Sequence, residues 1–416
     1  MKNIRDSAKI MIDRIIADNM PQKSVINALE AHEFTGDKVY LVAIGKAAWT
    51  MAKAASEYLG DKIEKGIVIT KYDHSQGEIP RLKIFEAGHP TPDENTVAAT
   101  NEALALVQDL RAGDEVLFLV SGGGSALFEA PQDGVTLEDF VVLTKDLLAS
   151  GADIVEINMI RKRLSKVKAG RFAELCKPAN VYAIILSDVL GDRLDTIASG
   201  PAVPDNSTAD DAKAIVEKYG LKLTDLQLSY LNQETPKVVD NVKTTVTGSV
   251  RSLCESAAAC AKELGFTPYV LTTTLSCEAS EAGKFLSVIA SDTQRGVTHF
   301  QKPCAIIAGG ETVVQLKGDG MGGRNQELAL TAAKGIAGLG DTLIFSLGSD
   351  GTDGPTDAAG GIVDGETVAN LLAKGINVDK ILANNDSYNG LKVVDSLIIT
   401  GPTGTNVNDV SVILCR

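Results

Sequence analysis

Short apolar runs alternate with helical stretches along the first half of this chain. Residues 38–44, 66–70, 82–88, 114–120 and 181–188 are rich in valine, isoleucine and leucine, and helical patterns over 46–59, 93–111 and 158–176 lie between them. Parallel strands that are buried on both faces have such continuous apolar sequences, and helices connect them. The alternation therefore predicts an α/β fold with a doubly wound sheet.

The same rhythm restarts after residue 247. A helix is predicted over 248–265, and strands over 268–274, 303–309, 312–316 and 342–348, with Gly309 and Gly310 forming a turn. A chain of 416 residues exceeds what one hydrophobic core usually supports, so two domains are expected. The polar segment 232–245 is the predicted boundary. We predict α/β domains at 1–240 and 241–416.

The composition excludes several classes of protein. The net charge of −14 disfavours a partner that is a nucleic acid or an anionic membrane, because either needs a broad basic surface. The six cysteines form no CxxC pair, and charges interrupt every apolar run near the N-terminus. No apolar stretch approaches the roughly 20 residues of a membrane span. We therefore expect a cytoplasmic protein without a signal peptide.

A glycine loop at 318–323 leads into a helical pattern. Glycines let backbone N–H groups approach a ligand, and the positive end of a helix favours anions there. Arg324 adds a planar cation that can bind a carboxylate or phosphate. The residues expected at this anion site are Gly322, Gly323, Arg324 and Asn325. A plain glycine turn is one alternative, and the G-x-G-x-x-G spacing of Gly318, Gly320 and Gly323 offers dinucleotide binding as another.

Two more candidate anion sites follow predicted strands. The run 114–120 leads directly into a loop whose backbone can curl around an anion, and this loop contains Ser121, Gly122, Gly123, Gly124 and Ser125. Lys46 follows Gly45 at a predicted strand-to-helix junction, where its ammonium could reach a phosphate. A flexible turn and a solvated helix-end lysine are the structural alternatives.

Six basic residues and no acid lie between residues 161 and 171. On a helix, Arg161, Leu164 and Lys168 share one face, so two cations accompany an apolar contact. We predict that Arg161 and Lys168 bind substrate or nucleotide, whereas Lys162 and Lys166 belong to a solvated face.

Carboxylates also gather where predicted strands end. They are Asp188, Asp192, Glu311, Asp350, Asp353 and Asp357. Carboxylates beside glycine turns suit Mg²⁺, which prefers one or two of them together with substrate phosphates. Each acid could equally be a turn former. Asp188, Asp350 and Asp353 are the candidate metal ligands, Asp188 and Asp192 are candidates for orienting an attacking hydroxyl, and Glu311 is a candidate for substrate or nucleotide binding.

The chain has no G-x-S-x-G and no H-E-x-x-H motif, which makes serine hydrolase and zinc protease chemistry improbable. His89 precedes a predicted helix, where a hydrogen-bonded structural role is favoured over substrate contact. Glycine loops, cations and dispersed acids at strand ends together indicate phosphoryl transfer, which depends on positioning and charge neutralisation.

Nine strings, in order, resemble the glycerate 2-kinases of the two-domain type whose C-terminal part is the MOFRL domain. They are AIGKAA (43–48), GHPTPDENT (88–96), VSGGGSAL (120–127), INMIRKRLSKVKAGR (157–171), LSDVLGDRLDTIASGP (186–201), GGETVV (309–314), GGRNQELAL (322–330), GSDGTDGPTDAAGG (348–361) and TGPTGTNVND (400–409). Ala169 follows Lys168 where similar proteins often carry a glycine.

The resemblance implies ATP- and Mg²⁺-dependent phosphorylation of D-glycerate at its 2-hydroxyl. It implies a Rossmann-like N-terminal domain, an active site in a cleft between the two domains, and functional roles for Lys46 and Arg324. An NAD(P)H-dependent hydroxypyruvate reductase and a catalytically silent nucleotide-sensing protein are the alternatives. The sequence leaves open the preferred 2-hydroxy acid and whether the chain forms a homo-oligomer.

Overall fold

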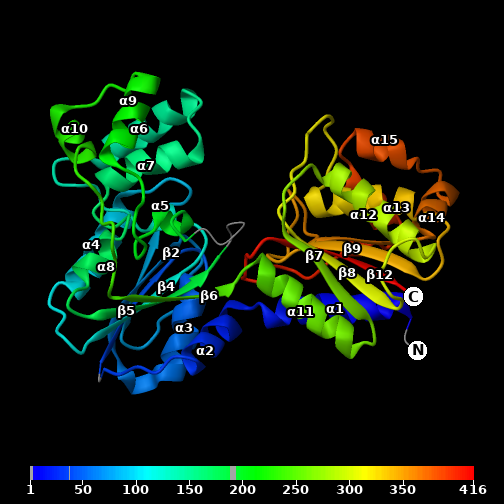
Figure 1. The fold of residues 1–416 in the computed structure, drawn as a ribbon, viewed down its shortest axis with the longest axis horizontal. Helices are drawn as coiled ribbons and strands as arrows, with labels where there is room; N and C mark the ends of the chain where they lie inside the picture. The colour runs from blue at the N-terminus through cyan, green and yellow to red at the C-terminus, as the bar shows by residue number, and fades with distance from the viewer. Residues whose placement is uncertain (1–2, 37, 188–193) are drawn as a thin grey trace. The chain divides into compact units, whose positions relative to one another are not determined.

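The computed structural model describes residues 3–36, 38–187 and 194–416. The chain divides into two compact units. The parallel unit spans residues 21–247, and the mixed unit combines the segment up to residue 20 with residues 248–416. Figure 1 shows the elements of each unit. The parallel unit and the mixed unit are named after the strand directions in their sheets.

The parallel unit is built on a six-stranded sheet with strand order β3-β2-β1-β4-β5-β6. Its strands are β1 (Val39–Ile44), β2 (Ile63–Lys71), β3 (Leu82–Ala87), β4 (Glu115–Val120), β5 (Asn180–Leu186) and β6 (Val242–Gly248). The pairings of β1 with β2 and β4, of β2 with β3 and of β4 with β5 are parallel. The first five strands confirm the predicted runs, and their carboxyl ends share one edge of the sheet.

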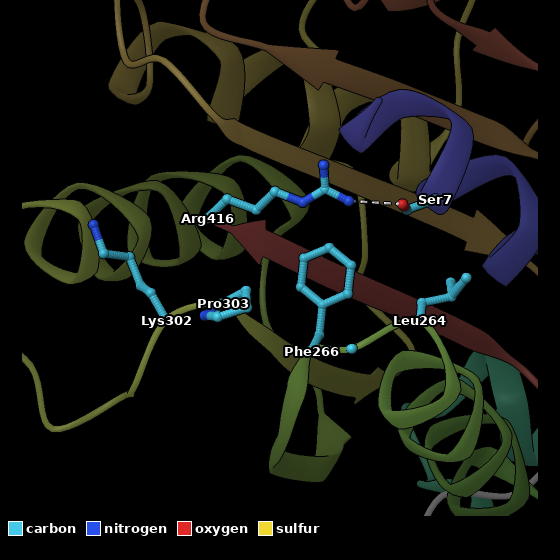
Figure 2. Close-up of a pocket in the computed structure, with 7 residues that line it drawn as sticks. Ser7, Leu264, Phe266, Lys302, Pro303 and Arg416 are labelled. Atoms are coloured by element: carbon cyan, nitrogen blue, oxygen red, sulfur yellow. Dashed lines mark hydrogen bonds between the residues drawn. The ribbon is translucent and has the colours of Figure 1, made fainter. Parts of the chain in front are cut away.

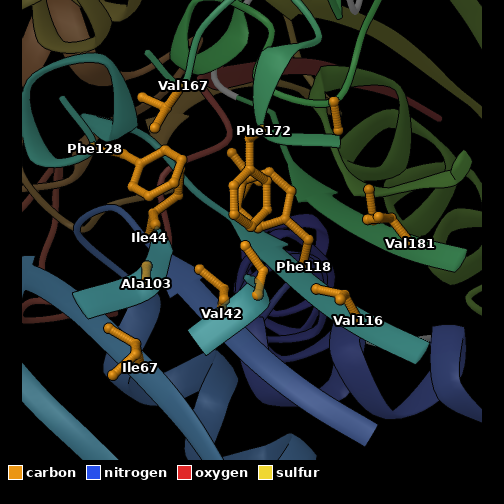
Figure 3. Close-up of a cluster of buried hydrophobic side chains, with 14 of the residues drawn as sticks. Val42, Ile44, Ile67, Ala103, Val116, Phe118, Phe128, Val167, Phe172 and Val181 are labelled. Carbon is orange, nitrogen blue, oxygen red and sulfur yellow. The ribbon is translucent and has the colours of Figure 1, made fainter. Parts of the chain in front are cut away.

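Both faces of this sheet are covered at its centre, which explains the apolar sequences of β1, β4 and β5. On one face Val42, Ile44 and Phe118 pack with residues of α4 and α8, and Phe118 lies 4.8 Å from Phe172 between ring centroids (Figure 3). The alternate residues of β1 and β4 point to the other face, and they too are buried. The helices of this unit are α2 (Pro21–Glu30), α3 (Ala48–Leu59), α4 (Glu94–Val107), α5 (Gly124–Leu127), α6 (Leu137–Ala149), α7 (Ile154–Leu164), α8 (Arg171–Leu175), α9 (Ala209–Tyr219) and α10 (Asp225–Leu231), with short 3-10 turns at Gly60–Lys62 and Ile197–Ser199.

Helices α6, α7, α9 and α10 form a second core of their own within the parallel unit. Phe140, Leu147, Ile160, Ile215 and Leu231 are buried together there, and Figure 1 shows these helices grouped at one end of the unit. Because α7 contributes apolar residues to this core, its remaining face is free to present polar side chains.

The mixed unit has a six-stranded sheet with order β11-β10-β9-β12-β8-β7. Its strands are β7 (Thr267–Leu275), β8 (Cys304–Gly310), β9 (Thr342–Gly348), β10 (Gly360–Asp364), β11 (Leu397–Ile398) and β12 (Asp409–Cys415). Only the pairing of β7 with β8 is parallel, and the others are antiparallel. The last strand, β12, lies between β8 and β9, so its first residue is beside their last ones.

The helices of the mixed unit include one from the start of the chain. They are α1 (Ile4–Asp18), α11 (Val250–Glu263), α12 (Ala279–Gln294), α13 (Arg324–Gly335), α14 (Thr367–Ala373), α15 (Val378–Ala383) and α16 (Ser387–Val393). Helix α1 packs on α11, where Ser252 Oγ donates to Asn19 Oδ1 at 2.6 Å. The unit boundaries at 20/21 and 247/248 therefore differ from the single predicted boundary at 240/241.

Three local predictions differ from the structure for identifiable reasons. The helix predicted over 158–176 is broken, because Ser165 is extended and Ala169 and Gly170 have φ angles of +57° and +79°. The strand predicted over 312–316 is reduced to one bridge between Val313 and Glu278. Gly309 and Gly310 lie within β8 rather than in a turn, since β7 and β12 pair with them there.

Among the described residues, we find no helix that combines the length and apolar character needed to cross a membrane.

Candidate active site

Lys46 stands at the junction of β1 and α3, beside the loop that follows β4. Gly45 has a φ of +110°, and a side-chain Cβ there would lie 2.3 Å from Ser121 Oγ, so this close approach requires glycine. The backbone N–H of Lys46 donates to Gly122 O at 2.8 Å. The half-buried side chain of Lys46 makes no hydrogen bond or ion pair within the described residues. Its ammonium is therefore available to a ligand.

The glycine loop after β4 contains both structural and open groups. Ser121 is buried, and its Oγ donates to Ile44 O at 3.2 Å and accepts from Ala47 N at 3.0 Å. These bonds give the predicted ligand Ser121 a structural task. The N–H groups of Gly122 and Gly123 have no acceptor among the residues that the structure describes. Two backbone donors thus remain open next to Lys46.

His89, which follows β3, also lies against this loop. A Cβ on Gly123 would be 2.9 Å from His89 Cδ2 and 3.3 Å from Lys46 Cγ. Burial, followed by the positive charges of Lys46 and Lys71, lowers the pKa of His89. The sequence favoured a structural histidine here, and the signals for a site were its place before a predicted helix and within the string GHPTPDENT.

Lys168 and Arg161 have different surroundings. Lys168 is fully buried 3.3 Å from Glu129 Oε2, and its Nζ donates to Ser125 O at 2.8 Å and Phe128 O at 3.2 Å. Burial lowers the pKa of Lys168 to about 8, although Glu129 opposes the shift. Lys168 therefore holds α5 in place rather than facing a ligand in this conformation. Arg161 has no carboxylate within ion-pair distance in the described part of the chain.

The mixed unit gathers charged groups where β8 and β9 end. Arg324 is the first residue of α13, and its Nε and Nη2 donate to the two oxygens of Asp409 at 2.6 and 3.1 Å. Its Nη1 donates to Glu311 Oε1 at 3.0 Å. Burial alone would lower the pKa of Arg324, but Asp409 and Glu311 more than offset it, so the net pKa is raised. The guanidinium is held firmly and stays partly exposed.

Asp409 was not among the predicted site residues. It begins β12, which runs antiparallel to β8 and β9, so it pairs with Gly310 and Gly348 at their carboxyl ends. A rule that looks only after strands misses a residue that precedes one. The string TGPTGTNVND, which ends at Asp409, was the available signal.

The first part of the glycine loop before α13 packs against another segment of the mixed unit. The N–H of Gly320 donates to Asn384 O at 2.9 Å, and the N–H of Met321 donates to Asp386 Oδ1 at 2.9 Å. A Cβ on Gly318 or Gly320 would lie 2.3 or 2.4 Å from Asn384. Close packing on the segment between α15 and α16 accounts for Gly318 and Gly320, so two glycines of the G-x-G-x-x-G spacing have a structural explanation.

The N-terminus of α13 is occupied by a carboxylate of the protein itself. Asp353 accepts from the N–H groups of Asn325 and Gln326 at 3.1 and 2.8 Å, and a Cβ on Gly323 would lie 2.3 Å from its Cγ. Asn325 is buried, and its Oδ1 accepts from Ser346 Oγ at 2.6 Å. Asp353 therefore caps the helix end that was predicted to bind substrate. The roles assigned to Gly322, Gly323 and Asn325 stay predictions without support from this geometry.

The predicted metal ligands are not assembled within the described residues. No group of three acids, histidines or cysteines lies close enough there to hold a metal ion. Asp353 is engaged by α13, whereas Asp350 is half-buried and uses one oxygen to accept from Thr352 N at 3.0 Å. Asp188 and Asp192 fall outside the described residues. Of the two described acids in this set, Asp350 is thus the one that keeps an oxygen for a cation.

The chain matches two family descriptions, a domain of unknown function (DUF4147) over residues 7–231 and the MOFRL family over residues 304–409. A D-glycerate 2-kinase from Thermotoga maritima is 54% identical over 95% of this chain and 93% of its own length. The crystal structure of a glycerate kinase from the same organism matches with a TM-score of 0.96 at 53% identity, covering 99% of both chains. The chain belongs to the glycerate 2-kinase family. A protein from Agrobacterium vitis named putative hydroxypyruvate reductase is more distant, at 39% identity over 90% of this chain and 98% of its own.

Membership of the glycerate 2-kinase family confirms the resemblance, and the strings that suggested it mark the groups described above. AIGKAA and VSGGGSAL bring Lys46 and the open glycine N–H groups together. GGETVV, GGRNQELAL and TGPTGTNVND supply Glu311, Arg324 and Asp409. Each unit of this kinase-family chain therefore carries one cluster of charged or donor groups at strand ends.

A separate pocket of about 480 Å³ lies in the mixed unit, away from these clusters (Figure 2). Leu264, Phe266, Lys302, Pro303 and Arg416 line it with Ser7 and Gly265. Arg416 lies over the Phe266 ring at 5.1 Å and donates to Ser7 Oγ at 3.1 Å. None of its lining residues is a predicted site residue.

The capping role of Asp353 makes a prediction about pH. Burial raises the pKa of Asp353 from 3.8 to about 6, although the N–H groups of Gln326 and Asn325 oppose the shift. The folded state thus binds this proton more tightly than the unfolded state, so its contribution to stability is complete below pH 4 and is lost as the pH rises to about 6. The Asp353→Asn variant lacks this titration. Between these pH values its free energy of unfolding should gain roughly 2–3 kcal/mol relative to the parent protein.

Urea unfolding of both proteins at several pH values measures this difference. A difference that stays constant from pH 4 to pH 6 would contradict the assignment. If Asp353 is a cap rather than a metal ligand, the Asn variant also keeps the Mg²⁺ dependence of the parent.

Proposed function

We propose that this protein transfers the γ-phosphoryl group of ATP to the 2-hydroxyl of D-glycerate, giving 2-phosphoglycerate and ADP. The observation that carries the proposal is the arrangement after β1 and β4, where the Lys46 side chain lies beside the N–H groups of Gly122 and Gly123 and none of these groups has a partner among the described residues. Phosphoryl transfer requires such fixed positive and N–H groups, because charge on the transferred group must be neutralised. The kinase names of the relatives agree with this reading.

The second contribution comes from Arg324, which Asp409 and Glu311 hold in one orientation. A fixed guanidinium can bind a carboxylate or stabilise a transferring phosphoryl group without reorganising. The prediction that Lys46 and Arg324 act in one cleft between the two domains stays a prediction. If both groups act on the same anion, the losses of turnover in Lys46→Ala and Arg324→Ala should be less than additive in the double variant.

Few protein ligands are needed to hold Mg²⁺ beside Asp350, which follows β9. The ion usually keeps waters and binds through one or two carboxylates together with substrate phosphates, and Asp350 can supply such an oxygen. When bound, Mg²⁺ neutralises phosphate charge. The protein's own residues bind and orient the substrates and keep water from the reacting groups.

An assay with D-glycerate, ATP and Mg²⁺ tests the proposal, with the product identified by phosphorus NMR. We expect stoichiometric ADP and 2-phosphoglycerate, and we expect excess EDTA to abolish turnover until Mg²⁺ is restored. NADH consumption with hydroxypyruvate at a comparable rate, or ADP formation that EDTA leaves unchanged, would refute it. Cytoplasmic location and a homo-oligomeric state remain separate proposals, and fractionation and size-exclusion chromatography test them.

A further inference from the structure

Four polar side chains of the parallel unit lie together beside α5, and Lys46 is not one of them. Asn158 and Arg161 are three residues apart on α7, so they share a face of that helix. Ser125 Oγ and Ser199 Oγ are 2.8 Å apart, and Ser199 Oγ donates to Asn158 Oδ1 at 3.3 Å. Arg161 Nη2 lies 3.5 Å from Ser125 O. Residues from three separate segments thus form one polar cluster.

Arg161 differs from the other cations between residues 161 and 171, because no ion pair or short hydrogen bond holds its guanidinium within the described residues. Lys162 and Arg163 pair with Asp205, Lys166 pairs with Asp133, Lys168 pairs with Glu129, and Arg171 donates to the carbonyls of Lys162 and Ser165. The Arg161 guanidinium lies over the Phe140 ring at 5.2 Å, and its Nε is buried with no hydrogen-bond partner in the described part of the chain. Its one hydrogen bond is at the limit of a useful distance.

The Arg161 side chain is partly exposed, but its Nε is buried without a hydrogen-bond partner among the described residues, which is unfavourable. Burial lowers the pKa of Arg161, and Glu129, whose charge opposes the shift, already pairs with Lys168. A guanidinium stays protonated even so, because its pKa is far above neutrality. The charged guanidinium of Arg161 is therefore available to an anion that the described residues do not supply.

The backbone at Ser199 shows that this cluster is held in a costly conformation. Ala198 and Ser199 have φ angles of +51° and +61°, although neither is glycine. Left-handed conformations cost L-residues roughly 1–2 kcal/mol each, and such strain persists where surrounding structure fixes it, often at functional sites. The turn places the buried Ser199 hydroxyl between Ser125 and Asn158. Because Asn158 Oδ1 accepts from Ser199, its Nδ2 is left as the donor for a ligand.

We propose that Arg161 and Asn158 bind the carboxylate of the small 2-hydroxy acid substrate, with Ser199 as the residue that positions Asn158. The planar guanidinium can bind both carboxylate oxygens, and the Asn158 amide adds a third N–H. No carboxylate of the described chain lies within ion-pair distance of Arg161, so the substrate meets no competing acid there. This assignment rests on the proposed function and adds to it a subsite for one substrate group.

The test separates the two substrates kinetically. In Arg161→Ala, KM for D-glycerate should rise roughly 10- to 100-fold, the effect of losing charged hydrogen bonds, while KM for ATP stays within about twofold. Ser199→Ala should raise KM for D-glycerate by roughly 2- to 10-fold with kcat nearly unchanged. The preference of the parent protein for D-glycerate over its uncharged methyl ester should shrink in Arg161→Ala. Lys166→Ala, which removes a solvent-facing cation of the same segment, is the matched control and should change none of these values.

The other outcomes are equally informative. A rise in KM for ATP alone would assign Arg161 to the nucleotide phosphates, and unchanged KM values for both substrates would make it a structural residue; either result overturns the inference. Arg161→Lys, which keeps the charge and loses the fork, covers the case in which the alanine variant does not fold. Calorimetric binding of D-glycerate to the parent and to Arg161→Lys tests the subsite without turnover. It also distinguishes failure of the subsite from failure of the proposed kinase reaction.

Discussion

Replacing Arg324 by alanine should reduce turnover by a factor on the order of 10² to 10³ and also destabilise the protein. The loss of turnover follows from removing a fixed charge-stabilising donor. The loss of stability follows from Asp409, whose side chain is only 8% exposed and would lose its ion-pair partner. Breaking a buried pair by removing one partner costs roughly 3–5 kcal/mol.

Truncating a surface arginine seldom changes the free energy of unfolding by more than about 0.5 kcal/mol. The ion pairs with Asp409 and Glu311 change that expectation, and a second substitution can separate the two effects. Arg324→Ala combined with Asp409→Asn removes the unpaired carboxylate, so it should recover much of the stability and none of the turnover. Urea unfolding and steady-state kinetics measure the two quantities. Recovery of turnover together with stability would show that Arg324 acts only as a structural residue.

Replacing Lys46 by alanine should give an equally large loss of turnover, on the order of 10² to 10³, with little change in stability. The substitution breaks no ion pair or hydrogen bond of the ammonium within the described residues, and the Lys46 side chain is half-buried. Removing it should therefore alter the free energy of unfolding by no more than about 0.5 kcal/mol. A variant with near-normal turnover would return Lys46 to the role of a solvated helix-end residue.

Two other lysines provide the controls for this experiment. Lys53 on α3 pairs with Glu57 at 3.0 Å on the surface, and Lys53→Ala should change neither property appreciably. Lys46→Ala should mainly reduce turnover, whereas Lys168→Ala should mainly reduce stability. The Lys168 variant leaves Glu129 buried and unpaired, which should cost roughly 3–5 kcal/mol. Equal loss of stability in Lys46→Ala and Lys168→Ala would contradict the distinction drawn here.

The elements that could be predicted are those whose pattern is local. The strands β1, β4 and β5 are nearly continuous apolar runs because both faces of the sheet are covered there, and β8 and β9 follow the same rule. The break between α7 and α8 depends on the backbone of Ala169 and Gly170, whose φ angles no periodicity reveals. The order of the mixed sheet depends on β12, which enters between β8 and β9 from the end of the chain.

The candidate site shows the same division. Lys46 and Lys168 are both lysines beside apolar segments, and nothing in their neighbouring residues says that only Lys168 will meet a carboxylate. That carboxylate, Glu129, comes from a distant part of the sequence. Likewise the glycines at 318–323 had the composition of an anion loop, but the N–H groups of Gly318 and Gly320 donate to Asn385 and Asn384, which lie far along the sequence. Burial and partners are tertiary properties, so they were outside the reach of the pattern.

The membership of α1 in the mixed unit has a consequence for how the protein is made. Ribosomes synthesise α1 first, but α11, on which it packs, begins only at Val250. The apolar face of α1 therefore stays exposed while the entire parallel unit is translated and folds. Residues 21–247 can fold as soon as they emerge, whereas the mixed unit stays incomplete until both distant segments are available. A truncation that deletes the first 20 residues would leave the parallel unit whole and uncover α11 in the other.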